Sequence, residues 1–359
     1  MHRDRSLDVL RGLFLIVITF DHFGGTLRTL TWQTFGYVSA AEGFIFLSGY
    51  MSGLVYGRPG YPRVTAHCLQ RALQIYGFHL FIVVCLITLS LSSSLYAGYW
   101  RGYVPLYSEA PWTGLGLSAV LLYNPNFLSI LPLYVIFLAL TPLLLQAHRR
   151  GWSAGILTAS LLLWWASQHG LRETLLQALP LDREQLAPGL FDITAWQLLF
   201  IAGNWLGYRR AKALPFRVPT SPSLLPVAVV GVSLLMAWRH GWLPAPEWIE
   251  AGHSRRTLEW VRLINFALVA WLFVWLLKPR HWFARLRFPA RLGENSLDVY
   301  SWSILAIFLA MPLTWRAHAA GPLIDILAAL AFVALLFVPV LIKPHFRNVS
   351  RGLRLAWSR

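Results

Sequence analysis

Long apolar segments recur along the whole chain, separated by short polar stretches, and this pattern constrains the fold more than any other feature. Only 13% of the 359 residues are charged, whereas 57% are hydrophobic. A soluble domain carries about 25% charged residues, and about 20 consecutive apolar residues suffice for a helix to cross a bilayer. The sequence therefore predicts an all-α membrane protein, a polytopic bundle of transmembrane helices.

Ten segments have a length and composition that suit membrane-spanning helices. We place them at residues 9–27, 37–56, 72–94, 127–146, 152–169, 192–209, 223–240, 260–278, 296–313 and 322–343. Many of the 18 tryptophans and 13 tyrosines lie near the segment ends, and these side chains prefer the membrane interface. We expect residues 1–359 to form one integral-membrane domain, with the first segment retained as a span rather than cleaved as a signal peptide.

The distribution of charge predicts the orientation of this bundle. When the N-terminus is placed in the cytoplasm, most of the 31 lysines and arginines fall in inner loops, and loop acids such as Glu109, Glu173 and Glu247 fall outside. This asymmetry fits ten spans with both termini inside. It also accounts for the net charge of +16 without a nucleic-acid partner. Segment 113–123 is too short to span and is expected to form a re-entrant or interfacial helix.

The first apolar segment contains two ionisable residues, Arg11 and His22, which are costly inside a membrane and therefore suggest function. Eleven residues of helix return to the same face, about 16 Å further along the axis. A neutral histidine can accept a proton from a hydroxyl and return it to a leaving group. We expect His22 to be the catalytic base, although hydrogen bonding to a neighbouring helix would also explain its position.

Two carboxylates are candidates to assist His22. Glu42 lies near the outer end of the second segment, at about the depth of His22, and can orient the imidazole and stabilise its protonated form. A structural ion pair is the alternative role for Glu42. Asp21 precedes His22 directly, so its side chain points about 100° away on a helix.

The inner ends of the first three segments carry the residues that we expect to bind an anionic group. Arginine pairs well with phosphate, which makes Arg11 and Arg71 candidates for a nucleotide-phosphate site. Arg58 is a further candidate, with a topology-setting loop charge as its alternative role. Asp8 lies three residues before Arg11 and is close enough on a helix to pair with it.

Other polar residues in the apolar segments are expected to join helices rather than to catalyse. These are His79, Gln197, Asn204 and Glu294 to Ser296. Gly49, Gly53 and Gly57 form a ladder of small residues, which is typical of close helix packing. The two cysteines, Cys68 and Cys85, indicate neither a disulfide framework nor a metal site, and no metal-binding motif is recognised.

The residues of the first segment also match a known pattern. Leu7 to Gly12 with Asp21 and His22 resembles the opening of the transmembrane acyltransferase superfamily, in which an Arg and a His separated by ten residues mark the first helix. Further segments resemble the OpgC family, which succinylates osmoregulated periplasmic glucans. They are residues 41–50 and 53–58, residues 71–76 with His79, and residues 130–134, 195–200, 292–293 and 296–297.

Two positions depart from the pattern that this resemblance implies. Ser303 stands where a histidine is expected in the ninth segment, and Ser129 stands where an aspartate is expected before Leu131 and Pro132. The resemblance therefore supports the acyl-transfer reaction more strongly than it supports a particular acyl group or acceptor.

The resemblance implies an O-acyltransferase of the bacterial inner membrane. Acyl-CoA, as succinyl-CoA or acetyl-CoA, is expected to bind on the cytoplasmic side near Arg11 and Arg71, without a metal cofactor. His22, oriented by Glu42, is expected to activate a hydroxyl of a periplasmic glucan or another glycan. Direct transfer and a transient acyl-histidine both remain open.

Two other functions are compatible with the residues. In a proton-coupled secondary transporter, Glu42 and His22 would relay protons and Arg11 would bind an anion, but the sequence has no visible repeat pair of the transporter type. In a non-catalytic membrane scaffold, Arg11 and His22 would affect only stability.

Overall fold

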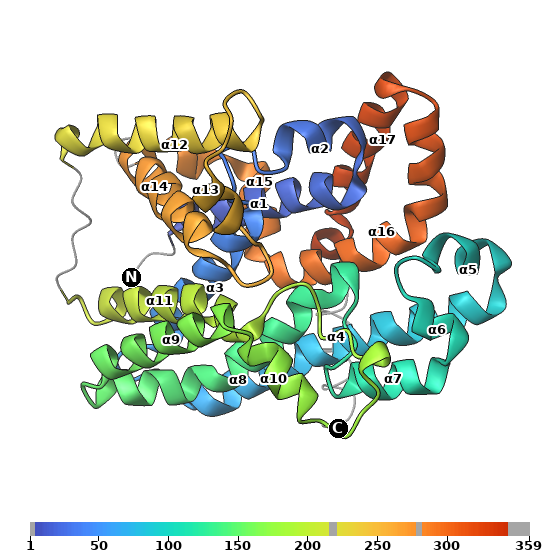
Figure 1. Ribbon diagram of the computed structural model, residues 1–359. Helices are drawn as coiled ribbons and strands as arrows, with labels where there is room; N and C mark the ends of the chain where they lie inside the picture. Colours follow the sequence, from blue (N-terminus) through green and yellow to red (C-terminus); the bar gives the residue numbers. More distant parts are fainter. Residues whose placement is uncertain (1–3, 215–220, 278–281, 344–359) are drawn as a thin grey trace, which may run out of the picture. The chain divides into compact units, whose positions relative to one another are not determined.

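The computed structural model describes residues 4–214, 221–277 and 282–343, and over these residues the fold is all-α, as the sequence predicts (Figure 1). The chain divides into two compact units, which are described separately. Unit 1 combines Met1–Trp32 with Pro279–Arg359, and unit 2 is Gln33–Lys278. A single domain over residues 1–359 stays a prediction.

Unit 1 brings the first apolar segment together with the last two. Its helices are α1 (Arg5–Phe23), α2 (Gly25–Thr31), η4 (Phe283–Arg285), α15 (Arg287–Glu294), α16 (Ser296–Ala319) and α17 (Pro322–Leu335). Helix α1 packs on α15, α16 and α17, and α17 also packs on α2.

Unit 2 contains the middle segments and the connections between them. Its helices are α3 (Ala40–Tyr56), α4 (Val64–Ser92), α5 (Ser94–Trp100), α6 (Pro105–Glu109), α7 (Pro111–Ala119), η1 (Asn126–Ser129), α8 (Ile130–Arg149), α9 (Ser153–Gln168), α10 (Leu171–Gln177), η2 (Arg183–Gln185), α11 (Ile193–Ala211), η3 (Pro222–Leu224), α12 (Leu225–Arg239), α13 (Glu247–Ala251) and α14 (Trp260–Leu277). Helices α8, α9 and α11 pack side by side (Figure 1). The predicted interfacial segment 113–123 contains the short helix α7, which packs on α4 and α6.

Each of the ten predicted segments contains one of the longer helices, and five described stretches are long and apolar enough to cross a membrane. These five are Val64–Ser92, Asn126–Arg149, Pro222–Arg239, Ser296–Ala319 and Pro322–Lys343. Helices α3 and α9 are shorter than the roughly 20 residues that a crossing needs, and α1 carries several charged side chains. A multi-pass membrane protein is therefore supported, while the count of ten spans and the orientation of the termini stay predictions.

Large apolar side chains on these candidate spans are exposed. Leu73 on α4 is 67% exposed, Val227 on α12 is 64% exposed and Leu323 on α17 is 69% exposed. Such surfaces are unfavourable in water, whereas lipid chains cover them at no such cost. The exposed faces are therefore the ones expected to contact the bilayer.

Helices α3 and α11 pack closely because glycines face the partner backbone on both sides. A Cβ atom added at Gly49 would overlap the carbonyl oxygen of Phe200, and one at Gly53 would overlap that of Asn204. From the other side, a Cβ atom at Gly203 or Gly207 would overlap carbonyl oxygens of α3. The close packing predicted for the ladder that begins with Gly49 and Gly53 is confirmed.

Helix α1 is held by a similar reciprocal contact with α15. A Cβ atom at Gly12 would overlap the carbonyl oxygen of Pro289, and one at Gly293 would overlap that of Asp8. The two backbones therefore touch at the residue that directly follows Arg11. This contact fixes the position of α1 within unit 1.

Candidate active site

Arg11 and His22 both lie on α1, which runs without a break from Arg5 to Phe23. Asp4 caps its start by accepting a hydrogen bond from Ser6 N at 3.1 Å. The helix ends at Gly24, whose φ of +85° is strained for any residue with a side chain. Because the helix is continuous, the two side chains share a face and are separated by about 16 Å along the axis.

The Arg11 end of α1 meets the beginning of α16. The guanidinium Nη2 of Arg11 donates a hydrogen bond to Ser296 Oγ, in the first turn of α16, where the helix dipole is positive. Lys343 lies at the same helix terminus, and its Nζ donates to Asn295 Oδ1 at 2.9 Å and to Asp298 Oδ2 at 2.5 Å. Two cations and a helix N-terminus therefore gather at this end of unit 1, and the interhelical role predicted for Asn295 and Ser296 is confirmed.

The His22 end of α1 meets α2, α16 and α17. His22 is half-buried in the last turn of α1, and its neighbour Asp21 accepts a hydrogen bond from Thr31 Oγ1 at 2.7 Å. The structure adds His318 and Asp325, which were not predicted as site residues. His318 Nδ1 lies 2.6 Å from Asp325 Oδ1. The sequence signal for this pair was an acidic residue within an apolar segment, at Asp325.

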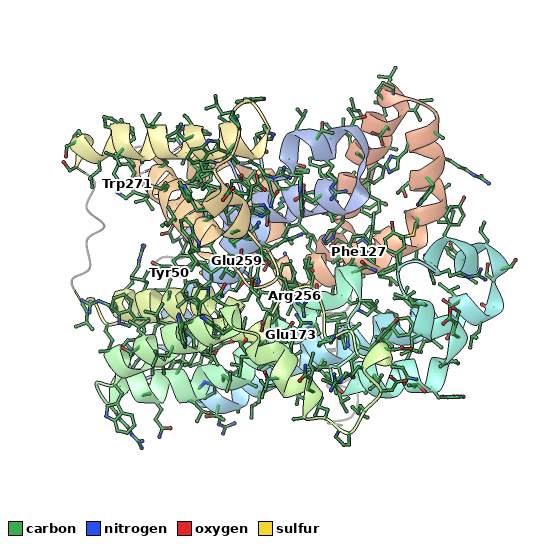
Figure 2. The ribbon with its side chains drawn as sticks, viewed as in Figure 1. Tyr50, Phe127, Glu173, Arg256, Glu259 and Trp271 are labelled. Carbon is green, nitrogen blue, oxygen red and sulfur yellow. The ribbon has the colours of Figure 1, made fainter. Side chains whose placement is uncertain are left out.

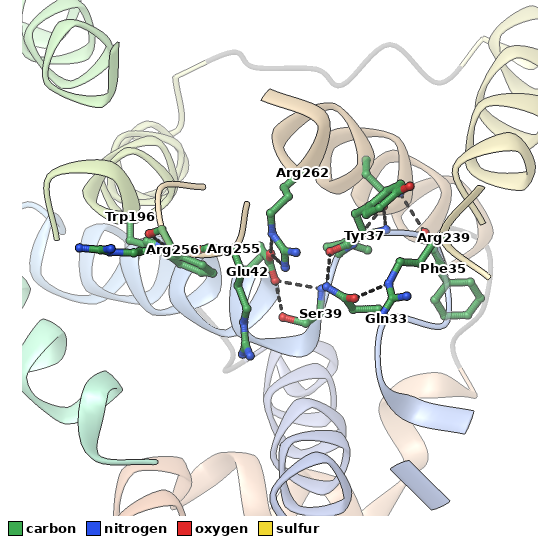
Figure 3. A network of polar contacts seen from close by, with 12 residues as sticks. Gln33, Phe35, Tyr37, Ser39, Glu42, Trp196, Arg239, Arg255, Arg256 and Arg262 are labelled. Carbon is green, nitrogen blue, oxygen red and sulfur yellow. Dashed lines mark hydrogen bonds and ion pairs between the residues drawn. The ribbon is translucent and has the colours of Figure 1, made fainter. Parts of the chain in front are cut away.

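Glu42 is fully buried in unit 2 and is held by two partners (Figure 3). Its Oε2 accepts hydrogen bonds from Ser39 N at 2.9 Å and Ser39 Oγ at 2.6 Å. Its Oε1 accepts from Arg262 Nε at 2.8 Å and also from Arg262 Nη2, and Arg262 is itself buried. The structural ion pair left open for Glu42 is thus observed, and a role in orienting His22 stays a prediction.

Arg262 was not predicted as a site residue, although it is an ionisable residue at the start of the apolar segment 260–278. Asn265, one helical turn further along α14, holds the segment that leads into α3, because its Oδ1 accepts hydrogen bonds from Tyr37 N at 2.6 Å and Val38 N at 3.0 Å. Gln33 donates from its side chain to the Tyr37 carbonyl oxygen at 3.0 Å. The start of α3, where Glu42 lies, is therefore rigidly anchored to α14.

The other predicted donor-side arginines lie in unit 2. Arg71, on α4, donates from Nη1 to Gln74 Oε1 at 2.5 Å on the same helix. Arg58 is exposed in the turn after α3. Phosphate binding by Asp8, Arg11, Arg58 and Arg71 stays a prediction, and Asp8 is buried in unit 1.

Three of the predicted helix-joining residues do join helices. His79 Nε2 lies 3.2 Å from the Ser118 carbonyl oxygen, linking α4 to α7. Asn204 donates to Ser52 Oγ at 2.8 Å, linking α11 to α3. Gln197 exchanges two hydrogen bonds, at 2.6 and 2.8 Å, with the α9 residue Ser160.

A second feature that sequence reasoning missed is the segment 254–259, whose carbonyl groups are bound by side chains of α9 and α11. Trp164 Nε1 donates to Leu258 O at 2.9 Å, and Gln168 Nε2 donates to Thr257 O at 2.9 Å. Trp196 Nε1 donates to the carbonyl oxygens of both Arg255 and Arg256. This segment is thereby fixed, even though Leu258 has a left-handed φ of +50°.

The fixed segment presents two arginines. Arg255 lies over the Phe191 ring, with 4.9 Å between its guanidinium carbon and the ring centre. Arg256 pairs with Glu173 (Figure 2). Arg172 lies in the same loop region and donates to the Gly189 carbonyl oxygen at 2.7 Å. Burial, followed by the positive charge of Arg256, lowers the pKa of the Arg172 guanidinium. The outer loop region predicted for unit 2 is therefore rich in fixed cations.

The two positions that depart from the expected pattern are both buried. Ser303 donates to the Tyr300 carbonyl oxygen of its own helix at 2.7 Å, and Ser129 donates to Asn126 O at 3.0 Å. Across the part of the chain that the structure describes, no three His, Cys, Asp or Glu side chains form a group that can hold a metal ion.

These features define a multi-pass helical membrane protein with an arginine and a histidine on one helix. The family model for OpgC protein matches residues 3–348, so the chain belongs to the OpgC family. Membership implies glucan succinylation, and therefore an acyl donor and a glucan as substrates. No curated protein and no solved structure matches the chain.

Proposed function

We propose that this protein is an inner-membrane O-acyltransferase that moves a succinyl group from cytoplasmic succinyl-CoA to a hydroxyl of a periplasmic glucan. The observation that carries the proposal is the continuity of α1 between Arg11 and His22. One end of this helix lies at a cationic helix N-terminus, and the other carries a titratable base. The two ends of this one helix can then contact the acyl donor on one side of the membrane and the glucan acceptor on the other side.

The Arg11 end suits the phosphates of coenzyme A. The Arg11 guanidinium and the Lys343 ammonium lie at the start of α16, where the helix dipole also favours an anion. We assign Arg58, Arg71 and Asp8 to the same donor side. In this proposal Asp8 pairs with Arg11 and does not contact phosphate. Acetyl-CoA, which lacks the terminal carboxylate, is the alternative donor.

The His22 end suits the acyl transfer itself. The imidazole takes the proton of a sugar hydroxyl, and the resulting oxygen attacks the thioester carbonyl carbon. A C–O bond forms, the C–S bond breaks, and the leaving thiolate receives the proton from the imidazolium. If His22 attacks first, a C–N bond forms as the C–S bond breaks, and the thiolate leaves with the proton of the imidazole. The sugar hydroxyl then attacks the acyl-imidazole, so that a C–O bond forms, the C–N bond breaks and the hydroxyl proton returns to His22. We assign Glu42 and Asp21 to stabilising the protonated form of His22.

The test is succinyl transfer by the purified full-length protein in detergent, with succinyl-CoA and periplasmic glucan, followed by mass spectrometry of the glucan. We expect the wild-type protein to add succinyl groups and His22→Gln to add none. His169→Gln is the matched control, because His169 is exposed at the end of α9, where its ring lies against the Trp165 ring and its Nδ1 contacts the Trp165 carbonyl oxygen. Full activity in the His22→Gln protein would overturn the assignment of the base.

A further inference from the structure

The turn that follows α1, one residue after His22, is built from two glycines and held by side chains of α16 and α17. Gly24 and Gly25 have φ values of +85° and +67°, a region that L side chains rarely adopt. Helix α1 ends here and α2 begins, so this turn sets where the last turn of α1, and with it His22, is placed.

His318, near the end of α16, has one contact at each ring nitrogen. Nε2 lies 3.2 Å from the carbonyl oxygen of Phe23, and Nδ1 lies 2.6 Å from Asp325 Oδ1. Both partners accept hydrogen bonds, and a neutral imidazole carries only one N–H. The ring therefore bridges two acceptors, the Phe23 carbonyl group on α1 and the Asp325 carboxylate on α17.

Asp325 connects His318 to the beginning of α2. Its second oxygen, Oδ2, accepts a hydrogen bond from Thr26 N at 2.5 Å, and the carboxylate is almost fully buried. A Cβ atom at Gly25 would overlap this carboxylate, so only glycine fits beside it. The ring of Phe23 also packs edge-on against the His318 ring. The contact between His318 and Asp325 thus holds residues on both sides of the turn.

We propose that His318 and Asp325 are positioning residues for His22, acting through the Phe23 carbonyl group and the start of α2. This inference rests on the proposed function, because it assumes that His22 is the catalytic base. Neither residue of the pair touches the reacting atoms in this role. They fix the last turn of α1, since a displacement of about 1 Å at a catalytic group can cost roughly 100-fold in rate.

The experiment compares purified full-length His318→Gln, Asp325→Asn and the double variant with the wild-type protein and the His169→Gln control. We expect each single variant to lower kcat for succinyl transfer by roughly 10- to 100-fold, with an unchanged KM for succinyl-CoA. The double variant should be no worse than either single variant, because each single variant already removes the same contact between residues 318 and 325. The rate at which diethyl pyrocarbonate modifies His22 should change in the variants and stay at its wild-type value in the control.

Three outcomes separate this inference from the proposed function. If the wild-type protein transfers nothing, or His22→Gln stays active, the proposed function fails and the inference with it. If His22→Gln is inactive and His318→Gln keeps wild-type kcat and wild-type His22 reactivity, the inference alone is overturned. If His318→Gln does not fold, His318→Gly with added imidazole takes its place, and restored kcat supports the inference whereas kcat unchanged by imidazole contradicts it.

Discussion

At the scale of single residues, the ionisable side chains in apolar segments are the features that the sequence reveals best. Arg11, His22 and Glu42 could each be selected from the sequence, because an ionisable side chain in a lipid-spanning helix is energetically costly and therefore suggests a function. Their partners could not be predicted. Arg262 lies 220 residues from Glu42, and the His318 and Asp325 pair depends on how α16 and α17 meet α1.

Substitutions of Glu42 and Arg262 test whether this buried ion pair contributes to stability or to catalysis. Removing one partner leaves an uncompensated buried charge, so Glu42→Leu or Arg262→Met should each cost about 3–5 kcal/mol of stability, measured by thermal unfolding in detergent. The double variant Glu42→Leu/Arg262→Met should recover most of this loss. A double variant that folds and transfers succinyl groups normally would exclude a role for Glu42 in orienting His22.

Arg11 should act on donor binding rather than on the chemical step. A hydrogen bond to a charged group is worth about 1.5–3 kcal/mol, so Arg11→Gln should raise KM for succinyl-CoA roughly 10- to 100-fold with little change in kcat. Steady-state kinetics measure both values. Arg101→Gln, which removes an exposed arginine from the segment after α5, should leave KM unchanged. A lower kcat with normal KM for Arg11→Gln would speak against phosphate binding.

At the scale of helices, hydrophobic length and composition predicted the elements well. All ten predicted segments contain a helix, because long apolar runs can satisfy their backbone groups in lipid only by forming one. The short helices α5, α6, α10 and α13 lie in connections without a long apolar run, so nothing in the pattern indicated them. Close packing was predictable where small residues repeat, as they do at Gly49 and Gly53, but the identity of the partner helix α11 was not.

The glycine contact between α3 and α11 makes a prediction about packing. Gly53→Ala places a methyl group against the carbonyl oxygen of Asn204 and should destabilise the protein by about 1–3 kcal/mol. Gly77→Ala on α4 is the matched control, because a Cβ atom there meets no atom within 4 Å, and it should change stability by about 1 kcal/mol or less. Thermal unfolding measures the stability of both variants. Equal stability would show that α3 and α11 can move apart at Gly53 without cost.

At the scale of the whole molecule, charge asymmetry is what predicts the sidedness of the bundle. The asymmetry fits ten crossings with both termini in the cytoplasm, whereas length and composition support five candidate spans among the described residues. The remaining segments are short or contain charged side chains, so apolar length alone does not decide whether they cross. Placement of Arg11 on the donor side and His22 on the acceptor side depends on this topology.

Cysteine labelling of intact cells tests the topology. In a variant without the two native cysteines, a membrane-impermeant maleimide should label single cysteines at Arg101 and Trp242, which the ten-span arrangement places outside. It should not label cysteines at Gly151 and Ser221, which that arrangement places inside. All four positions are exposed in their own units. Labelling of Gly151 or Ser221 in intact cells would require a different number of crossings.

The most direct measurement is succinyl transfer across a membrane by the reconstituted protein. Succinyl-CoA is supplied only on the side that carries the inner loops, periplasmic glucan only on the other side, and glucan succinylation is followed by mass spectrometry. We expect transfer by the wild-type protein and by His169→Gln, and no transfer by His22→Gln. Transfer by His22→Gln, or transfer that occurs only when donor and glucan share one side, would contradict a His22-dependent reaction that spans the membrane.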